Sequence, residues 1–330
     1  MSASRINYSI FEDMYFFKLI RPLNLIIVAL TMYGLAWYFE SVFGESPKYG
    51  ITSLPFSLLA LSTIMIAAAG NIINDYFDIK ADRINKPDRV IIGVHIKRRV
   101  AIVSHWGLNF IAFSIAVYLS WIMESFLYLF VHLMSINILW FYSMKAKRQF
   151  LTGNVLIAGL TATVPLLVGL YFYQVYGSRQ SILITNEFPF LGDLNELYTL
   201  YLTFGLAIFA FILNFAREIV KDIEDIEGDK KLPSKTLPIV LGIKKSKTIV
   251  LLILSSTIIA SFILWTLSAE INLIDWVPLM IAAFLIVLCF IMLPKAYEKK
   301  QLKRINSLIK LAMVFGTATP IYWNILMIYG

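Results

Sequence analysis

The sequence has little of what disulfides and transition-metal sites are built from. It contains one cysteine, Cys289, and three histidines that lie far apart, at positions 95, 105 and 132. No disulfide can form within the chain, and neither a cysteine cluster nor a histidine zinc site is indicated. Charged residues make up only 15% of the chain, against about 25% in soluble proteins. This composition argues against a disordered chain, a nucleic-acid-binding domain and most soluble enzymes.

Apolar residues dominate instead and gather in blocks. The hydrophobic set accounts for 59% of residues, and the mean hydropathy is +0.74. A helix needs about 20 apolar residues to cross a bilayer, and the sequence contains nine such blocks. The predicted spans are Pro22–Phe39, Ile51–Ile73, Ala101–Met123, Ser125–Tyr142, Leu151–Tyr176, Leu197–Ala216, Thr248–Leu267, Trp276–Leu293 and Leu308–Tyr329. We expect an all-α, polytopic membrane protein whose residues 1–330 form a single domain in the lipid bilayer.

The basic residues behind the net charge of +8 are concentrated in segments on one side of the predicted membrane spans. If the N-terminus is cytoplasmic, all but two of the 29 lysines and arginines fall in cytoplasmic segments, the exceptions being Lys48 and Arg179. Basic residues are retained on the cytoplasmic side, so this asymmetry supports both the span count and the orientation. It predicts a cell (inner) membrane protein with a cytoplasmic N-terminus and an external C-terminus. Because topology accounts for the positive charge, no nucleic-acid partner is expected. Residues 1–20 lack the apolar core of a cleavable signal peptide.

Carboxylates are concentrated in two of the cytoplasmic segments, and membrane topology does not explain them. The pattern D-x-x-D-x-x-x-D occurs at 75, 78 and 82 and again, in the same register, at 222, 225 and 229. Each copy follows the second helix of a predicted set of four. The sequence therefore indicates an internal repeat, with halves of about 18–150 and 151–295 and a ninth helix at about 308–329.

Helical spacing gathers the polar side chains of each copy on one face. If the helices continue through the motifs, Asn74, Asp78 and Asp82 share a face. The second face is formed by Glu218, Asp222, Asp225 and Asp229. Clustered carboxylates repel one another unless a cation lies between them. Oxygen ligands without histidine or cysteine select Mg²⁺ or Ca²⁺, and Mg²⁺ commonly binds carboxylates together with substrate phosphates. The pattern therefore predicts Mg²⁺-assisted handling of a diphosphate at the cytoplasmic end of the helices.

These motifs carry a resemblance to a known family. N-D-x-x-D-x-x-x-D after the second helix and D-x-x-D-x-x-x-D after the sixth resemble the UbiA superfamily of intramembrane prenyltransferases. The match covers nearly the whole chain and is most similar to the digeranylgeranylglyceryl-phosphate synthase branch at Asn74–Arg89 and Arg217–Asp229. Smaller landmarks are Arg21-Pro22-Leu23-Asn24, Tyr142-Ser143 and Gly153-Asn154. Relatives often continue into Pro-Ile-Pro-Ser-Gly where this chain has Val90-Ile91-Ile92-Gly93, a departure that bears on the acceptor.

The resemblance implies a UbiA-like fold of two four-helix pseudo-repeats plus a ninth helix. It also implies transfer of a prenyl group from an allylic diphosphate to a lipophilic acceptor in membrane lipid biosynthesis, and the geranylgeranyl group is the best match. Two Mg²⁺ ions would bridge the diphosphate. The resemblance implies no obligatory protein partner. The expected metal ligands are Asn74, Asp78, Asp82, Asp225 and Asp229. The expected catalytic carboxylates are Asp75, Asp78, Asp82, Asp222, Asp225 and Asp229. The expected diphosphate-binding cations are Arg21, Arg89, Lys145, Lys147 and Lys235.

Other interpretations stay open from the sequence alone. A CDP-alcohol phosphotransferase would need a D-G-x-x-A-R signature, which the chain lacks. A secondary transporter would place its carboxylates near mid-membrane rather than at one face. Within the prenyltransferases, geranylgeranylglyceryl phosphate is the best acceptor on motif similarity. A basic pocket for its phosphate would come from Lys97-Arg98-Arg99 or from Lys244-Lys245-Lys247. An aromatic acceptor of a quinone, tocopherol or chlorophyll-type pathway is the alternative.

Overall fold

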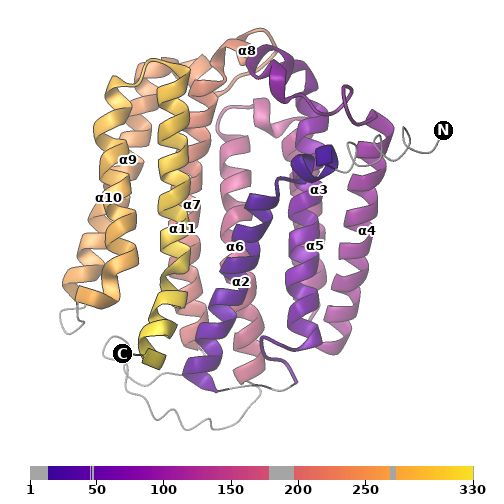
Figure 1. Ribbon diagram of the computed structural model, residues 1–330, viewed down its shortest axis with the longest axis vertical. Helices are drawn as coiled ribbons and strands as arrows, with labels where there is room; N and C mark the ends of the chain where they lie inside the picture. Colours follow the sequence, from indigo (N-terminus) through magenta and orange to yellow (C-terminus); the bar gives the residue numbers. More distant parts are fainter. Residues whose placement is uncertain (1–13, 45, 47, 178–196, 268–272, 330) are drawn as a thin grey trace. The chain divides into compact units, whose positions relative to one another are not determined.

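The described part of the chain consists mainly of long helices (Figure 1). The computed structural model describes residues 14–44, 46, 48–177, 197–267 and 273–329, so Arg5 and Arg179 of the charge pattern lie outside the described residues. Within these ranges nine helical segments are long and apolar enough to cross a membrane. Their helices are α2 (Pro22–Phe43), α3 (Leu54–Asn85), α4 (Arg98–Ile122), α5 (Leu127–Met144), α6 (Thr152–Gly177), α7 (Leu197–Glu224), α9 (Leu237–Leu267), α10 (Val277–Met292) and α11 (Lys299–Tyr329). The predicted all-α membrane architecture is confirmed.

Several helices extend well beyond the predicted spans. α3 continues to Asn85 rather than stopping at Ile73, and α11 begins at Lys299 rather than at Leu308. α9 begins at Leu237, ahead of the predicted Thr248, and contains a non-helical residue, Gly242, with a φ of 82°. Hydropathy marks only the part of a helix that lies in hydrocarbon. Charged residues can continue the same helix into the aqueous interface, so the predicted ends were too short there.

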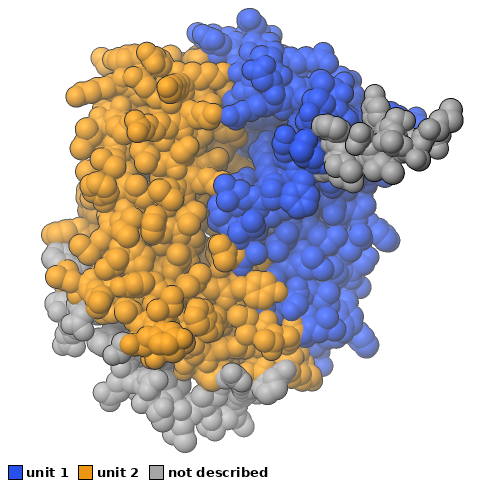
Figure 2. Space-filling view, viewed as in Figure 1, with its two compact units in different colours: residues 1–29, 54–153, 227–235 blue, residues 30–53, 154–226, 236–330 orange. Residues whose placement is uncertain are grey.

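The chain forms two compact units, which Figure 2 colours separately. Unit 1 comprises residues 1–29, 54–153 and 227–235. Unit 2 comprises residues 30–53, 154–226 and 236–330. The boundary passes through the second aspartate motif, because Asp222 and Asp225 belong to unit 2 whereas Asp229 belongs to unit 1. Each unit has its own buried side chains.

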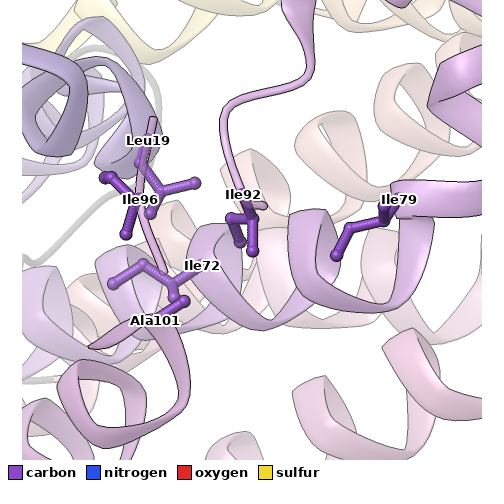
Figure 3. Close-up of a cluster of buried hydrophobic side chains, with 6 residues drawn as sticks. All are labelled: Leu19, Ile72, Ile79, Ile92, Ile96 and Ala101. Carbon is purple, nitrogen blue, oxygen red and sulfur yellow. The ribbon is translucent and has the colours of Figure 1, made fainter. Parts of the chain in front are cut away.

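Unit 1 is built around α3, which packs against both α4 and α5. At one end of α3 a cluster of buried apolar side chains covers the helix: Leu19, Ile72, Ile79, Ile92, Ile96 and Ala101. Figure 3 shows Ile92 reaching toward α3 from its loop, between Ile72 and Ile79. Ile92 is 1% exposed, and it lies in the segment that departs from the Pro-Ile-Pro-Ser-Gly pattern. The departure therefore supplies an apolar anchor for this loop, and Gly93 (φ 86°) turns the chain directly after it.

Unit 2 is built around α7, which packs against α9 and α11, while α10 packs against the same two helices. Aromatic side chains fill much of its interior. Tyr38 and Phe39 of α2 are fully buried, and the Phe39 ring lies 5.6 Å from that of Phe172 on α6. The hydroxyls of Tyr38 and Tyr198 are hydrogen-bonded at 2.6 Å. Buried tyrosines normally find such a partner, because an unpaired hydroxyl is costly away from water.

Gly169 sets the approach of α6 to α7 within unit 2. A Cβ atom at this position would lie 2.8 Å from Thr203 Cβ and 2.9 Å from the carbonyl oxygen of Thr199, closer than such atoms can pack. Small residues commonly permit this contact between membrane helices. We expect Gly169→Ala to destabilise the protein by about 1–3 kcal/mol through overpacking, measured as a fall in Tm in detergent.

Gly159 provides the matched control on the same helix. No atom lies within 4 Å of a Cβ built at this position. Gly159→Ala should leave Tm unchanged or raise it slightly, because alanine favours helix by about 1 kcal/mol over glycine. Equal Tm values for the two variants would show that the α6–α7 contact is not limited by Gly169.

Candidate active site

The first aspartate motif lies on the last turns of α3, and the prediction that it is helical is confirmed. Asn74 and Asp78 are one turn apart, and the Asn74 amide donates a hydrogen bond of 2.9 Å to a carboxylate oxygen of Asp78. Asp78 is only 5% exposed. Asp82 follows one turn later on the same helix. The spacing read from the sequence therefore gathers oxygen ligands along one side of α3.

Lys147 is the cation that meets this group. Its ammonium forms an ion pair with Asp78 and lies 3.4 Å from the Asn74 amide oxygen. Burial alone would lower the pKa of Lys147, but the attraction of Asp78, with smaller contributions from Tyr142 and Asp82, outweighs it and raises the pKa. Lys147 therefore stays charged beside the motif and balances part of its negative charge.

The turn between α5 and α6 explains how Lys147 reaches Asp78. Residues Ala146–Arg148 form a short 3-10 helix, η2, and the Arg148 guanidinium donates to the Phe77 carbonyl oxygen at 3.2 Å. Gly153 packs directly onto this turn, since a Cβ there would lie 2.7 Å from Lys147 Cα. The Gly153 landmark thus has a steric cause: only glycine lets the start of α6 pass so close to the backbone of Lys147.

Arg21 is the second cation at the motif. It forms an ion pair with Asp75, which lies one residue after Asn74 on α3. Burial would lower the pKa of Arg21, but the charges of Asp75 and Asp78 outweigh it and raise the pKa. Asp75 and Asp78 are thus each matched by one basic side chain from outside α3. Of the five cations expected at the diphosphate, Arg21 and Lys147 are the two that contact the carboxylates in the described residues.

The second motif differs from the predicted continuous helix. α7 ends at Glu224, and a short helix, α8 (Ile226–Lys230), follows. The Gly228 backbone N–H donates to the Asn85 side chain at 3.0 Å, so this segment is held by the end of α3 within unit 1. The prediction that Asp229 shares one helix face with Glu218, Asp222 and Asp225 is therefore wrong at Asp229. A side chain distant in sequence, that of Asn85, holds α8 after the helix has ended.

Within unit 2 the carboxylates of α7 have distinct partners. Asp222 accepts a hydrogen bond of 2.8 Å from the Asn154 side chain at the start of α6. Glu218 is bound by Arg217 at 2.9 Å and by Lys221 at 3.1 Å, both on its own helix. Glu218 is thereby paired with two cations of its own helix, and the Asn154 amide orients Asp222.

The remaining predicted cations lie on the surface. Arg89 in the short helix η1 (Pro87–Arg89), Lys145 and Lys235 are all exposed. Among the described residues, none of these three side chains forms a hydrogen bond or ion pair with a motif carboxylate. Lys235 does take part in unit 1 through its backbone N–H, which donates to the Arg148 carbonyl oxygen at 2.7 Å.

Of the asparagines that hold these groups in place, the sequence marked only Asn154, as part of the Gly153-Asn154 landmark, and not Asn71 or Asn85. Asn154 binds Asp222, Asn85 binds Gly228, and Asn71 donates to the Ile20 carbonyl oxygen at 2.9 Å. Asn85 and Asn154 lie at the ends of α3 and α6, and Asn71 lies one turn before Asp75 inside α3. A polar side chain at the edge of an apolar span is the signal that would have marked Asn71.

The donor set of the motifs fits a hard divalent cation. Within the described ranges no three His, Cys, Asp or Glu side chains are arranged as a ready-made metal site. The side chains on α3 offer carboxylate and amide oxygens, and two of the carboxylates already attract positive charge from Arg21 and Lys147. Oxygen-only ligands with this excess of negative charge suit Mg²⁺, which completes its shell with water and substrate phosphates.

Within the described residues, the nine candidate membrane spans define an integral membrane protein, and unit 1 carries carboxylates paired with cations on the last turns of α3. The sequence model of the UbiA prenyltransferase family matches residues 23–317. The chain therefore belongs to the UbiA prenyltransferase family, and it is a multi-pass membrane prenyltransferase.

Individual relatives agree with this membership. The digeranylgeranylglyceryl phosphate synthase of Thermococcus sibiricus is 32% identical over 250 residues, which cover 75% of this chain and 76% of that protein. A solved structure from work on digeranylgeranylglyceryl phosphate synthase in membranes aligns with a TM-score of 0.62 and 25% identity, covering 96% of this chain and 99% of the other. A UbiA homologue from Archaeoglobus fulgidus, solved with GPP and Mg²⁺ bound, has a TM-score of 0.51 at 18% identity, with 92% and 99% covered.

Proposed function

We propose that this enzyme transfers a geranylgeranyl group from geranylgeranyl diphosphate to geranylgeranylglyceryl phosphate in membrane lipid biosynthesis. The bond between C1 of the allylic group and the diphosphate breaks, and its electron pair leaves with the diphosphate. The acceptor hydroxyl oxygen then bonds to C1 and releases its proton. Binding of the diphosphate donor is supported by one observation: Arg21 and Lys147 form ion pairs with carboxylates of α3.

The main barrier in this reaction is separation of charge, because the departing diphosphate gains negative charge as C1 becomes cationic. Preorganised positive groups lower such a barrier most when they are already in place before the reaction. Lys147 and Arg21 are held in this way by ion pairs and by the turns that carry them. Mg²⁺ held by the neighbouring oxygens would neutralise further charge on the leaving group.

The ligand assignment follows the repeat in the sequence. We assign Asn74, Asp78 and Asp82 to one Mg²⁺ ion and Asp225 with Asp229 to a second. Asp222, oriented by Asn154, assists the second ion, and Asp75 acts through its ion pair with Arg21. Arg89, Lys145 and Lys235 lie on the surface, and we assign them to attracting the diphosphate rather than to holding it.

The phosphate of the acceptor needs a basic pocket of its own. Lys247 is unsuited to this role, because its side chain is buried and donates to the carbonyl oxygen of Ala296 at 2.6 Å. Lys97, Arg98 and Arg99 are exposed at the start of α4, directly after the loop anchored by Ile92. We therefore assign the acceptor phosphate to the basic segment 97–99.

The orientation follows from the charge pattern. We place the N-terminus and the aspartate motifs on the cytoplasmic side of the cell membrane and the C-terminus outside, because basic residues are retained where the protein is made. The phosphorylated head groups of the two lipid substrates then lie on the same side of the membrane as the motifs. The reaction as proposed needs the two substrates, Mg²⁺ and the bilayer, and no second protein.

The test is a prenyl-transfer assay on detergent-purified protein with radiolabelled geranylgeranyl diphosphate and Mg²⁺. Geranylgeranylglyceryl phosphate and, separately, aromatic acceptors such as homogentisate are offered to equal amounts of enzyme. We expect labelled product with the glycerol phosphate and none with the aromatic compounds. A reaction without enzyme gives the background.

The other outcomes are equally informative. Product with an aromatic acceptor alone would keep the diphosphate chemistry and overturn the assignment of the acceptor. No product with any acceptor, from protein whose thermal unfolding shows it to be folded, would overturn the proposed reaction as a whole.

A further inference from the structure

Arg21 has an unusual backbone conformation for a residue so close to the proposed active site. It joins a helical segment, residues 14–20, to α2, and its φ is 56°. A positive φ at the end of a helix is normally adopted by glycine, because other residues pay a steric cost of about 1 kcal/mol or more there. A long cationic side chain at such a turn is therefore held in place by contacts that outweigh this cost.

Two successive turns of α3 supply these contacts. The Asn71 amide donates to the carbonyl oxygen of Ile20 at 2.9 Å, and Asp75, four residues further along α3, forms an ion pair with the side chain of Arg21. Residues four apart lie on the same face of a helix. One face of α3 thus binds the backbone immediately before Arg21 and the guanidinium of Arg21 itself.

The Asn71 hydrogen bond also acts on a group that needs a partner. The Ile20 carbonyl belongs to the last turn of the helical segment 14–20, where carbonyl oxygens have no partner within the helix. The Arg21 N–H turns back to the Lys18 carbonyl oxygen at 3.2 Å, and the Arg21 carbonyl accepts from the Asn24 N–H at 2.9 Å as α2 begins. Asn71 therefore fixes the turn at the peptide bond that sets the direction of the Arg21 side chain.

We propose that Asn71 is a positioning residue that holds Arg21 ready for the diphosphate. This inference rests on the proposed function, in which Arg21 contacts the diphosphate. In this role Asn71 contributes to affinity only through Arg21 and touches no substrate itself. Without it, the Ile20–Arg21 turn is free to relax its positive φ, and the guanidinium must be reordered each time a diphosphate binds.

A double-mutant cycle separates this role from a general contribution to folding. Binding of inorganic pyrophosphate with Mg²⁺ is measured by calorimetry on the full-length protein in detergent, for wild type, Asn71→Leu, Arg21→Ala and the double variant. Asn71→Leu keeps the size of the side chain and removes the donor. Asn71→Gln, which retains an amide donor, is the conservative variant. Asn137→Leu is the control, since Asn137 donates to the Leu133 carbonyl oxygen of its own helix.

We expect Asn71→Leu to weaken pyrophosphate binding about tenfold in the wild-type background and less than about twofold in the Arg21→Ala background, since the two residues act as a unit. Asn71→Gln should recover part of the affinity, and Asn137→Leu should have no effect. An equal loss in both backgrounds would overturn the inference. So would unchanged binding in Arg21→Ala, which removes the contact through which Asn71 is proposed to act.

Failure of the proposed reaction gives a different result. Pyrophosphate binding involves no acceptor and no bond cleavage, so the cycle can be completed even if no prenyl product forms. If no prenyl product forms but the cycle still shows that Asn71 acts on pyrophosphate binding through Arg21, the proposed reaction is contradicted and the positioning role of Asn71 is supported.

Discussion

The Asp78→Asn protein is expected to lose about 10³-fold or more in kcat/KM for prenyl transfer, an effect of the size seen when one preorganised charge-stabilising group is removed. Asparagine has nearly the shape of aspartate and can keep the contact with Asn74, but it carries no charge. Asp78 is buried between Asn74 and Lys147, so no other residue can take its place without moving the helix. The rate is measured with saturating acceptor over a range of diphosphate and Mg²⁺ concentrations.

One side effect of this substitution has to be controlled. Asp78→Asn leaves the ammonium of Lys147 in a buried position without its carboxylate, which can cost about 3 kcal/mol of stability. The double variant Asp78→Asn/Lys147→Met removes the unpaired charge and should regain Tm without regaining activity. Asp88→Asn makes the same change at an exposed residue of η1 and should be fully active. Full Mg²⁺-dependent activity in a folded Asp78→Asn protein would contradict the ligand assignment.

Removal of divalent metal is expected to abolish product formation, to below about 0.1% of the starting rate, because a metal that neutralises the leaving group contributes several kcal/mol to catalysis. Activity should return when Mg²⁺ is added in excess of EDTA. The rate is measured by the same radiolabelled assay, before chelation, after chelation and after addition of Mg²⁺. Undiminished turnover in excess EDTA would show that the basic side chains alone support the departure of the diphosphate.

The fold itself should survive this treatment. Asp75 and Asp78 are each paired with a cation of the protein, so their repulsion is already reduced before any metal binds. We expect Tm to change by no more than about 2 °C on chelation, a shift that corresponds to about 1.4 kcal/mol for a protein of this size. A large fall in Tm would instead identify the metal as a structural component and would make the loss of activity uninformative about catalysis.

The membrane architecture could be predicted because its cause is local in the sequence. Each apolar block is long enough to span, and the spans coincide with helices such as α2 and α6. The cytoplasmic ends could not be predicted from hydropathy, since α3 runs on through charged residues to Asn85. The segment after the break at Glu224 is held by a hydrogen bond between Asn85 and Gly228, which are 143 residues apart. No local pattern carries that information.

The sequence predicted which carboxylates and asparagine of the first motif share a face of one helix, but not which cations contact them. The register of Asn74, Asp78 and Asp82 on one helix followed from spacing alone, and the structure has them on α3. The cations could not be ranked, because their reach depends on turns: Arg21 on a positive φ, and Lys147 on the close packing of Gly153. Basic residues at a membrane surface look alike in the sequence, whatever their backbone allows them to contact.

The discontinuity of unit 1 has a consequence for biosynthesis. Residues 227–235 belong to this unit, tied in by Gly228 to Asn85 and by Lys235 to Arg148. A ribosome that has translated α3, α4 and α5 has still to make α6 and α7 before this segment emerges. Unit 1 is therefore completed late in translation, and a truncated product ending before residue 227 would contain the first aspartate motif without the segment that binds Asn85 and Arg148.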